Sequence, residues 1–321
     1  MDWLSFRTFA PYFQRMNVKS LSWLIFVLLC FIWGSSFILM KYSQQGLTAT
    51  QIAALRIFSA GIVLLPFAIY PFIKFPKNKL FYTILVGIVG NLLPAFLFAE
   101  AISKNIDSAL AGILNSLTPI CVVIIAILFF KDVIKTKKII GVAIGFVGLC
   151  ILTVSHQSFS FQNAGYALLI FAATILYGIN VNVVGHYLKD LNPVHVAAIS
   201  LSFMAIPSAI VLLFNGFFQL DFSDQIILKA VIASSLLGIV ASAIATALFY
   251  ILVTKAGGLF ASLVTYGVPF VALFWGFIYG EKISWIEIVC LGLILSGVYI
   301  VNMPDKKELH TSPEFANEKE F

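Results

Sequence analysis

The chain has 321 residues, of which 61% are hydrophobic and only 11% are charged. A soluble chain carries charges on about a quarter of its residues, so most of this exterior must face hydrocarbon. These proportions exclude a soluble globular domain, a disordered chain and a disulfide scaffold. The net charge of +6 is not gathered in a basic soluble module, so no nucleic-acid partner is expected. We predict an all-α polytopic membrane protein with the lipid bilayer as its surroundings.

Residues 1–20 are predicted to form a cytoplasmic N-terminal tail. Arg7, Arg15 and Lys19 precede an apolar run that is longer than a signal-peptide core and lacks a small-residue cleavage site. We therefore interpret this segment as uncleaved. Its aromatic residues leave open a short interfacial helix, and Met16 leaves open a second translation start.

Ten apolar runs then follow, each treated as a membrane-spanning helix. The predicted spans are 21–42, 50–73, 80–102, 107–130, 138–154, 164–186, 195–215, 227–254, 258–280 and 284–302. The connections are short and rich in turn-forming residues, so no soluble domain fits between spans. Residues 303–321 are polar and aperiodic, which predicts a disordered cytoplasmic tail.

The distribution of positive charge predicts the orientation. With ten spans, fifteen of the 20 lysines and arginines fall on the side of both termini, four fall on the other side, and Arg56 lies within a span. Cytoplasmic loops carry the excess of Lys and Arg in membrane proteins. We therefore expect a multi-pass protein of the cytoplasmic (inner) membrane with both termini in the cytoplasm.

Residues 21–154 and 164–302 are predicted to be two repeats of five spans each. Landmarks recur at a spacing of about 150 residues, slightly less near the start of each repeat. The matching pairs include Trp33 with Tyr177, Ala54 with Ala198, Phe98 with Phe249, Asn115 with Thr265, and Pro119 with Pro269. An odd number of spans inverts the second copy relative to the first, as expected of a secondary transporter.

With these landmarks the chain resembles the drug/metabolite transporter superfamily, EamA type, over about residues 21–302. The resemblance is carried by Trp33-Gly34-Ser35-Ser36-Phe37, Leu55-Arg56, the two proline-containing helices, and Gly280-Glu281 before a last span with Gly297. It implies a ten-helix carrier, often an exporter of amino acids or other metabolites, with a cavity lined mainly by spans one, three, four, six, eight and nine. The second half lacks a counterpart of Arg56, and Phe130-Lys131-Asp132 replaces the usual Gly-Glu pair, so these polar groups are not expected to act symmetrically.

Polar side chains at membrane depth are the candidate site residues, because a charge at the centre of a span costs about 2.5–3.5 kcal/mol. The candidate substrate contacts are Trp33, Ser36, Arg56, Asn91, Asn115, Tyr177, Asn180, Thr265 and Tyr266. Arg56 can attract a carboxylate, or it can snorkel outward or bind backbone carbonyls of a neighbouring helix. Asn91 can bind substrate or bridge helices.

Two proline-containing spans carry a matching stripe of small and polar residues. Ser108, Gly112, Asn115 and Pro119 share one helix face, and Gly258, Ser262, Thr265 and Pro269 repeat the pattern. Each proline frees a backbone carbonyl, which protein or a watery cavity must then satisfy. The stripes predict either a cavity wall beside a mobile helix, with Pro119 and Pro269 as the gating points, or close helix packing.

Glu100 is the candidate for proton coupling, because it is the only acidic residue with any depth in a predicted span. Lys104 follows four residues later, so an interfacial salt bridge is the alternative, and facilitated export or exchange stays open. No cofactor and no metal site are expected, since the cysteines lack metal-ligand spacing and the histidines lie in loops or at helix ends. Glycines 141, 145, 148 and 292 suggest helix packing, within a monomer or in a homodimer.

The leading hypothesis is a secondary transporter that exports small organic metabolites such as amino acids by alternating access. An alternative is a translocator of lipids or polyprenyl lipids, which needs a lateral opening between spans. A membrane-embedded enzyme is disfavoured because it needs convergent His, Asp or Glu residues. The sequence shows no Walker motif and no channel filter motif. Substrate identity and direction stay open.

Overall fold

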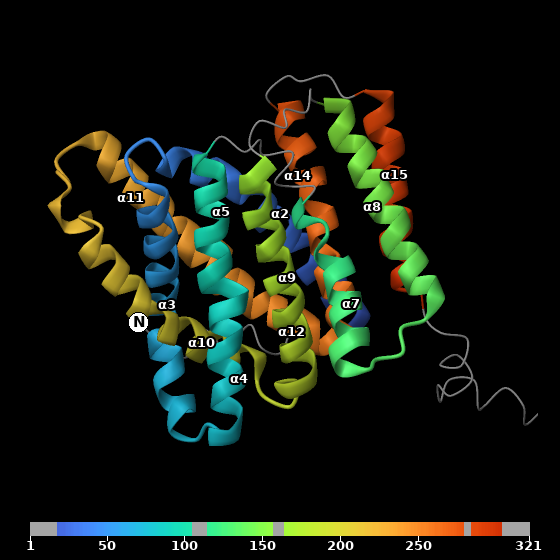
Figure 1. Cartoon of the computed structure of the whole chain (residues 1–321), viewed down its shortest axis with the longest axis horizontal. Helices are drawn as coiled ribbons and strands as arrows, with labels where there is room; N and C mark the ends of the chain where they lie inside the picture. Colours follow the sequence, from blue (N-terminus) through green and yellow to red (C-terminus); the bar gives the residue numbers. More distant parts are fainter. Residues whose placement is uncertain (1–17, 105–113, 157–163, 279–283, 304–321) are drawn as a thin grey trace, which may run out of the picture.

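The computed structural model describes residues 18–104, 114–156, 164–278 and 284–303. Within these ranges the chain is helical and has no β-strand. Figure 1 shows the helices standing side by side, with their connections gathered at two opposite ends. We call the end that contains residues 74–76, 131–135 and 188–192 the lysine-rich end, and the end that contains residues 44–48 and 215–224 the opposite end.

The helices of the two halves follow one another in a similar order. The first half contains α2 (Val18–Ser43), α3 (Ala49–Ile73), α4 (Lys77–Gly87), the π-helix η1 (Ile88–Leu92), α5 (Leu93–Ser103), α7 (Thr118–Phe130) and α8 (Thr136–His156). The second half contains α9 (Ala164–Tyr187), α10 (Pro193–Phe214), the 3-10 turn η3 (Phe217–Gln219), α11 (Gln225–Gly238), the π-helix η4 (Ile239–Ile244), α12 (Ala245–Ala256), α13 (Gly258–Ser262), α14 (Val264–Ile278) and α15 (Trp285–Val301).

Local sequence signals fix several helix starts. Thr48 and Gln51 form a capping box at the start of α3, in which each side chain accepts a hydrogen bond from the other's backbone N–H. Asn192 caps α10, whose first residue is Pro193, and Asp224 caps α11 through the N–H of Ile226.

Six helical segments are long and apolar enough to cross a membrane, and all six coincide with predicted spans. They are Val18–Ser36, Ala49–Ile73, Lys77–Ser103, Gly165–Tyr187, Pro193–Phe214 and Gln225–Ala256. The other four predicted spans coincide with α7, α8, the pair α13 and α14, and α15, in which the apolar stretches Thr118–Phe130, Gly258–Val271 and Ile288–Val301 are shorter. Residues 107–113 lie outside the described residues. A polytopic membrane protein is thus confirmed, whereas the count of ten spans stays a prediction.

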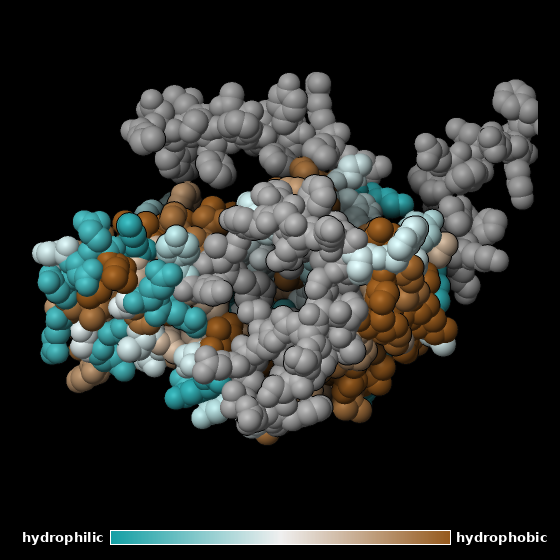
Figure 2. Space-filling view, turned by 90° about the horizontal axis from the view of Figure 1, so that it is seen from above, coloured by the Kyte–Doolittle hydropathy of each residue, from teal (hydrophilic) through white to brown (hydrophobic). Residues whose placement is uncertain are grey.

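The outward faces of α8 and α15 are apolar, as lipid contact requires. Large hydrophobic side chains such as Ile140, Val147, Ile288 and Leu295 are exposed there. Figure 2 views the opposite end and shows hydrophobic side chains over the side where Figure 1 places these two helices. Hydrophilic side chains gather on the other side of this view, where Figure 1 places the start of α11.

Glycines allow α8 of the first half and α15 of the second half to pack closely, and equivalent positions of the two helices make the contact at both ends. In the pairing of α8 with α15, a Cβ added at Gly141 would lie 2.9 Å from the carbonyl oxygen of Gly297, and one added at Gly148 would lie 3.1 Å from that of Cys290. At a spacing of 149 residues, 141 corresponds to 290 and 148 to 297. The same contact is therefore made twice, and it brings the two helices together antiparallel.

A second reciprocal contact lies at mid-depth. Gly87, at the end of α4, packs against the backbone carbonyl of Ser200 in α10. Gly238, at the end of α11, packs in the same way against the backbone carbonyl of Arg56 in α3. Gly87 corresponds to Gly238, and Arg56 corresponds to Ser200 in the repeat alignment. No larger residue fits either position without moving a helix, because backbone atoms of the neighbour would meet its Cβ.

Each half widens its third span into a π-helix at the same place. The π-helix η1 joins α4 to α5, and η4 joins α11 to α12, about 151 residues later. Pro94 follows η1 and cannot donate to the carbonyl of Gly90, which contributes to the irregularity of that turn. Because π-turns redirect side chains and interrupt the regular hydrogen bonds, they frequently mark functional positions in helices.

Candidate functional site

Arg56 joins the two halves of the chain at mid-depth. Its Nε donates a hydrogen bond to Oγ of Ser242 in η4, at 2.7 Å. Tyr177 of α9 packs near Phe98 of α5, with the ring centroids 6.2 Å apart, and no hydrogen bond joins it to Arg56 among the described contacts. Among the described residues no carboxylate pairs with this guanidinium group. A cation held within apolar helices without a carboxylate partner is suited to receive an anionic group of a ligand.

A group of hydrogen-bonded side chains lies beside the π-helices. Asn91 in η1 accepts a hydrogen bond from Oγ1 of Thr246 at 2.9 Å, and Asn180 in α9 accepts one from the Tyr250 hydroxyl at 3.1 Å. The Tyr250 hydroxyl also interacts with Ser200 of α10. We call Arg56, Asn91, Asn180, Ser200, Ser242, Thr246 and Tyr250 the central polar cluster. All of its members except Arg56, which is partly buried, are buried.

Trp33 braces this region from α2. Its indole Nε1 donates to the carbonyl oxygen of Ala241 in η4 at 3.0 Å, and its ring packs against Phe249 with the centroids 5.4 Å apart. A π-turn leaves backbone carbonyls without their usual hydrogen-bond donors. The indole N–H of Trp33 is such a donor for the carbonyl of Ala241. Thus Trp33 connects the first half to the second, as Arg56 and Asn91 also do.

Other predicted site residues are bound within their own helices or in helix packing. Ser36 donates to the carbonyl of Trp33 at 2.6 Å, and Thr265 donates to that of Ser262 at 3.0 Å. Tyr266 is fully buried, and its hydroxyl donates to the carbonyl of Val142 in α8 at 3.0 Å. These contacts place Tyr266 between α14 and α8, whereas the central polar cluster is formed by α3, α9, α10 and the two π-containing spans.

The two prolines lie near breaks in their helices. Pro119 is in the first turn of α7, immediately after a turn at 116–117, and Pro269 lies inside α14, six residues after the turn at Leu263. Asn115 stands before the first break, and its buried Oδ1 has no hydrogen-bond partner. Ser108 and Gly112 of the predicted stripe lie outside the described residues.

Glu100 lies near the end of α5 and faces Lys104. The Oε1 to Nζ distance is 3.7 Å, and both side chains are nearly half exposed. This geometry matches the salt-bridge alternative, in which the carboxylate is paired at the surface of the bundle instead of lining the central polar cluster.

Unpaired polar atoms identify where a ligand can complete the site. The Nδ2 of Asn91 is buried without a partner, although its Oδ1 is bound. A buried donor without an acceptor costs about 1–3 kcal/mol, so an acceptor oxygen of a solute would stabilise this position. Within the described residues no group of three His, Cys, Asp or Glu could hold a metal ion. The available chemistry is one guanidinium group with amides and hydroxyls, which suits a small organic solute.

Four members of the central polar cluster were not among the predicted contacts: Ser200, Ser242, Thr246 and Tyr250. Serine and threonine within an apolar helix commonly bond their own backbone, so they carry little signal alone. The repeat spacing would have identified two of them. In the repeat alignment, Asn91 corresponds to Ser242 and Arg56 corresponds to Ser200.

The EamA-like transporter family matches the chain twice, over residues 21–154 and 164–303. A WAT1-related chloroplastic protein of Arabidopsis thaliana is 24% identical over 89% of this chain and 70% of its own length. The uncharacterized inner membrane transporter YedA of Escherichia coli is 26% identical over 85% of this chain and 87% of its own length. One solved structure has a TM-score of 0.67 at 18% identity and covers 89% of this chain and 98% of that chain, which supports the same fold.

Proposed function

We propose that this chain, which belongs to the EamA-like transporter family, exports small organic metabolites such as amino acids by alternating access. A transporter role follows from the family and from the multi-pass helical architecture. Metabolite export and the mechanism are our proposal. The observation that carries it is the central polar cluster around Arg56, set between helices whose remaining surfaces are apolar.

The composition of the cluster favours an uncharged or zwitterionic solute. Arg56 provides one positive charge for a carboxylate, and the other members offer amide and hydroxyl groups. A solute with several negative charges would meet only one cation there. An amino acid in zwitterionic form can place its carboxylate at Arg56 and an acceptor oxygen at the Nδ2 of Asn91.

Alternating access is supported by where the polar contacts run. Arg56 bonds Ser242, Asn91 bonds Thr246, and Trp33 bonds the backbone of η4, so each contact connects the first half to the second. A relative movement of the halves would remake these contacts around a solute at mid-depth. The reciprocal glycine contacts support our proposal that the halves are inverted repeats of five spans, ten in total.

We further propose that the protein lies in the cytoplasmic membrane as a monomer or homodimer, with both termini in the cytoplasm. The lysine-rich end would then be the cytoplasmic end, in agreement with the distribution of positive charges. A relative whose name describes an inner membrane transporter is consistent with this location.

The test begins with purified protein and a set of solutes: amino acids, sugars, nucleosides and cationic drugs. A solute that binds the folded state raises the unfolding temperature in proportion to the logarithm of its concentration over its Kd. A stabilising solute is then tested for exchange in proteoliposomes, with and without a proton gradient. Stabilisation and exchange by amino acids would support the proposal. Stabilisation by polyprenyl phosphates alone would replace it with lipid translocation.

A further inference from the structure

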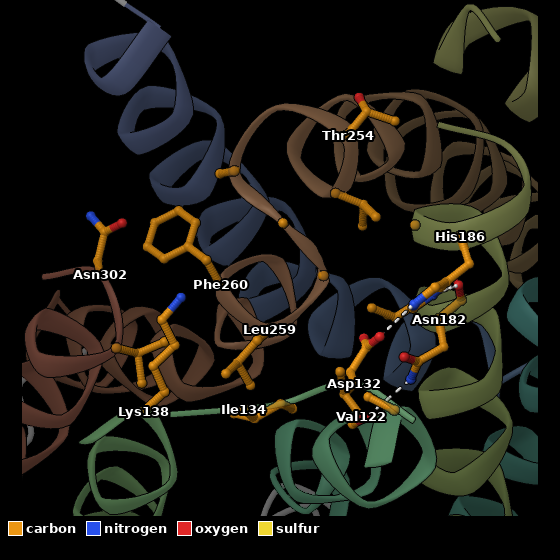
Figure 3. A pocket seen from close by; sticks show the side chains of 18 of the residues that line it. Val122, Asp132, Ile134, Lys138, Asn182, His186, Thr254, Leu259, Phe260 and Asn302 are labelled. Atoms are coloured by element: carbon orange, nitrogen blue, oxygen red, sulfur yellow. Dashed lines mark hydrogen bonds and ion pairs between the residues drawn. The ribbon is translucent and has the colours of Figure 1, made fainter. Parts of the chain in front are cut away.

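A cavity of about 720 Å³ opens at the lysine-rich end, away from the central polar cluster. It lies among the ends of α7, α9, α12 and α15, the start of α13, and the connection from α7 to α8. Figure 3 shows Lys138, Phe260 and Asn302 on one side of it and Asp132, His186 and Asn182 on the other. Val181, Val253 and Leu259 contribute an apolar part of the lining.

The charged side chains that line this cavity are mostly cationic. Four lysines belong to the lining: Lys19, Lys135, Lys138 and Lys189. Asp132 is the only acidic residue among the described lining residues, and its Oδ1 lies 3.0 Å from Nε2 of His186. The other ring nitrogen, Nδ1, lies 2.9 Å from the carbonyl oxygen of Asn182.

These two contacts fix the position of His186 beside Asp132. The imidazole of His186 therefore bridges the Asp132 carboxylate and the backbone carbonyl of Asn182 in α9. Phe130 stacks on the imidazole with the centroids 4.2 Å apart and helps to hold it in place. Asp132 supplies one negative charge against the four lysines, so the described lining of the cavity is cationic in total.

Membrane orientation alone does not explain why four lysines line one cavity. Lys74, Lys77 and Lys131 are exposed at the same end and do not line the cavity. The lining lysines come from four separate places in the chain: the start of α2, the connection after α7, the first turn of α8 and the connection after α9. An excess of positive charge in a cavity with an apolar lining is suited to an anionic group attached to an organic body.

We propose that this cavity is a binding site for a phosphate group, independent of the central polar cluster. Several lysine ammonium groups around one cavity match the multiple charged oxygens of a phosphate better than the single charge of a carboxylate. The group can belong to a soluble organic phosphate or to an anionic phospholipid headgroup. Both sources reach a cavity at the membrane surface, and basic pockets between spanning helices are known to hold anionic headgroups.

The test measures the thermal stability of the purified full chain at constant ionic strength. The probes are inorganic phosphate, glycerol 3-phosphate and short-chain phosphatidic acid, with short-chain phosphatidylcholine as the neutral-headgroup reference. The double variant Lys138→Gln with Lys189→Gln removes two lining charges. The matched control, Lys74→Gln with Lys77→Gln, removes two exposed charges at the same end. Asn302→Asp adds a negative charge to the lining with almost no change of shape, and guards against misfolding of the double variant.

We expect a phosphate probe to raise the unfolding temperature of the wild-type chain and of the control. The double variant should need about 30-fold more probe for the same shift, since each lysine near a charged headgroup contributes about fivefold. Asn302→Asp should weaken binding in the same direction. A response to glycerol 3-phosphate identifies a soluble ligand, and a response to phosphatidic acid alone identifies a headgroup. The proposal fails if no phosphate probe stabilises the protein, or if the lining variants and the control respond alike. Because binding is measured without transport, this result is independent of the proposed export function.

Discussion

Arg56 and Ser242 lie 186 residues apart in the chain, yet Nε of the arginine donates to Oγ of the serine at 2.7 Å. Their partners in the repeat alignment, Ser200 and Asn91, are both buried, uncharged members of the central polar cluster. The same pair of positions therefore belongs to the cluster in both halves, once with a cation and once without. This asymmetry makes Arg56 the one cation of the central polar cluster.

Gly238 should not tolerate a side chain. A Cβ there would meet the carbonyl of Arg56 and the hydroxyl of Ser59, so Gly238→Ala should force α11 away from α3 and destabilise the protein by about 1–3 kcal/mol. Thermal unfolding in detergent measures the loss. Gly292→Ala is the matched control, because nothing lies within 4 Å of the corresponding Cβ. Equal stability of the two variants would show that α11 and α3 are not in close contact.

Tyr266 should act in packing. Tyr266→Phe removes the hydrogen bond to the carbonyl of Val142 and should lower stability by about 0.5–1.5 kcal/mol while leaving the transport KM unchanged. Thermal unfolding and transport kinetics are measured on the same preparation. A large increase in KM at unchanged stability would instead place Tyr266 in the substrate site.

Glu100 should not carry the coupling proton. Its carboxylate is nearly half exposed and pairs with Lys104, so Glu100→Gln should change stability by less than about 1 kcal/mol. Uptake into proteoliposomes should respond to a proton gradient as the wild type does. Lys104→Gln serves as the control for loss of the ion pair alone. If Glu100→Gln alone abolished the response to the gradient, Glu100 would be the coupling residue.

The orientation can be read with a membrane-impermeant thiol reagent. Ser223→Cys at the opposite end should be labelled in intact cells, and Asn78→Cys at the lysine-rich end should be labelled only after permeabilisation. Both positions are exposed, whereas three of the four native cysteines are buried and give little background. Labelling in the reverse order would place the lysine-rich end outside the cell.

Much of the architecture could be predicted from the sequence, because membrane spans follow from apolar length. The helices that contain the six long spans begin and end within about three residues of the predicted bounds. Arg56, Asn91 and Asn180 were expected at membrane depth from their polarity, and the structure brings all three into the central polar cluster.

The π-helices could not be predicted in the same way. A π-turn changes the number of residues per helical turn by less than one, and only over a short segment. In a uniformly apolar helix no polar face reveals such a small change in periodicity. That shift determines which side chains face the centre, so Ser242 and Thr246 looked like ordinary helix residues. Nor does the sequence reveal that Tyr266 bonds a neighbouring backbone, since this depends on how α14 packs against α8.

The measurement that tests the central claim most directly is solute exchange in proteoliposomes by the wild type, Arg56→Gln, Arg56→Lys and Ser242→Ala, using a solute that stabilises the purified protein. Loss of the guanidinium should reduce transport of a carboxylate-bearing solute about 10- to 100-fold. Arg56→Lys keeps the charge and should retain part of the activity, and Ser242→Ala, which only frees Arg56 Nε, should have a smaller effect. Equal exchange by all four proteins would contradict a substrate site at the central polar cluster.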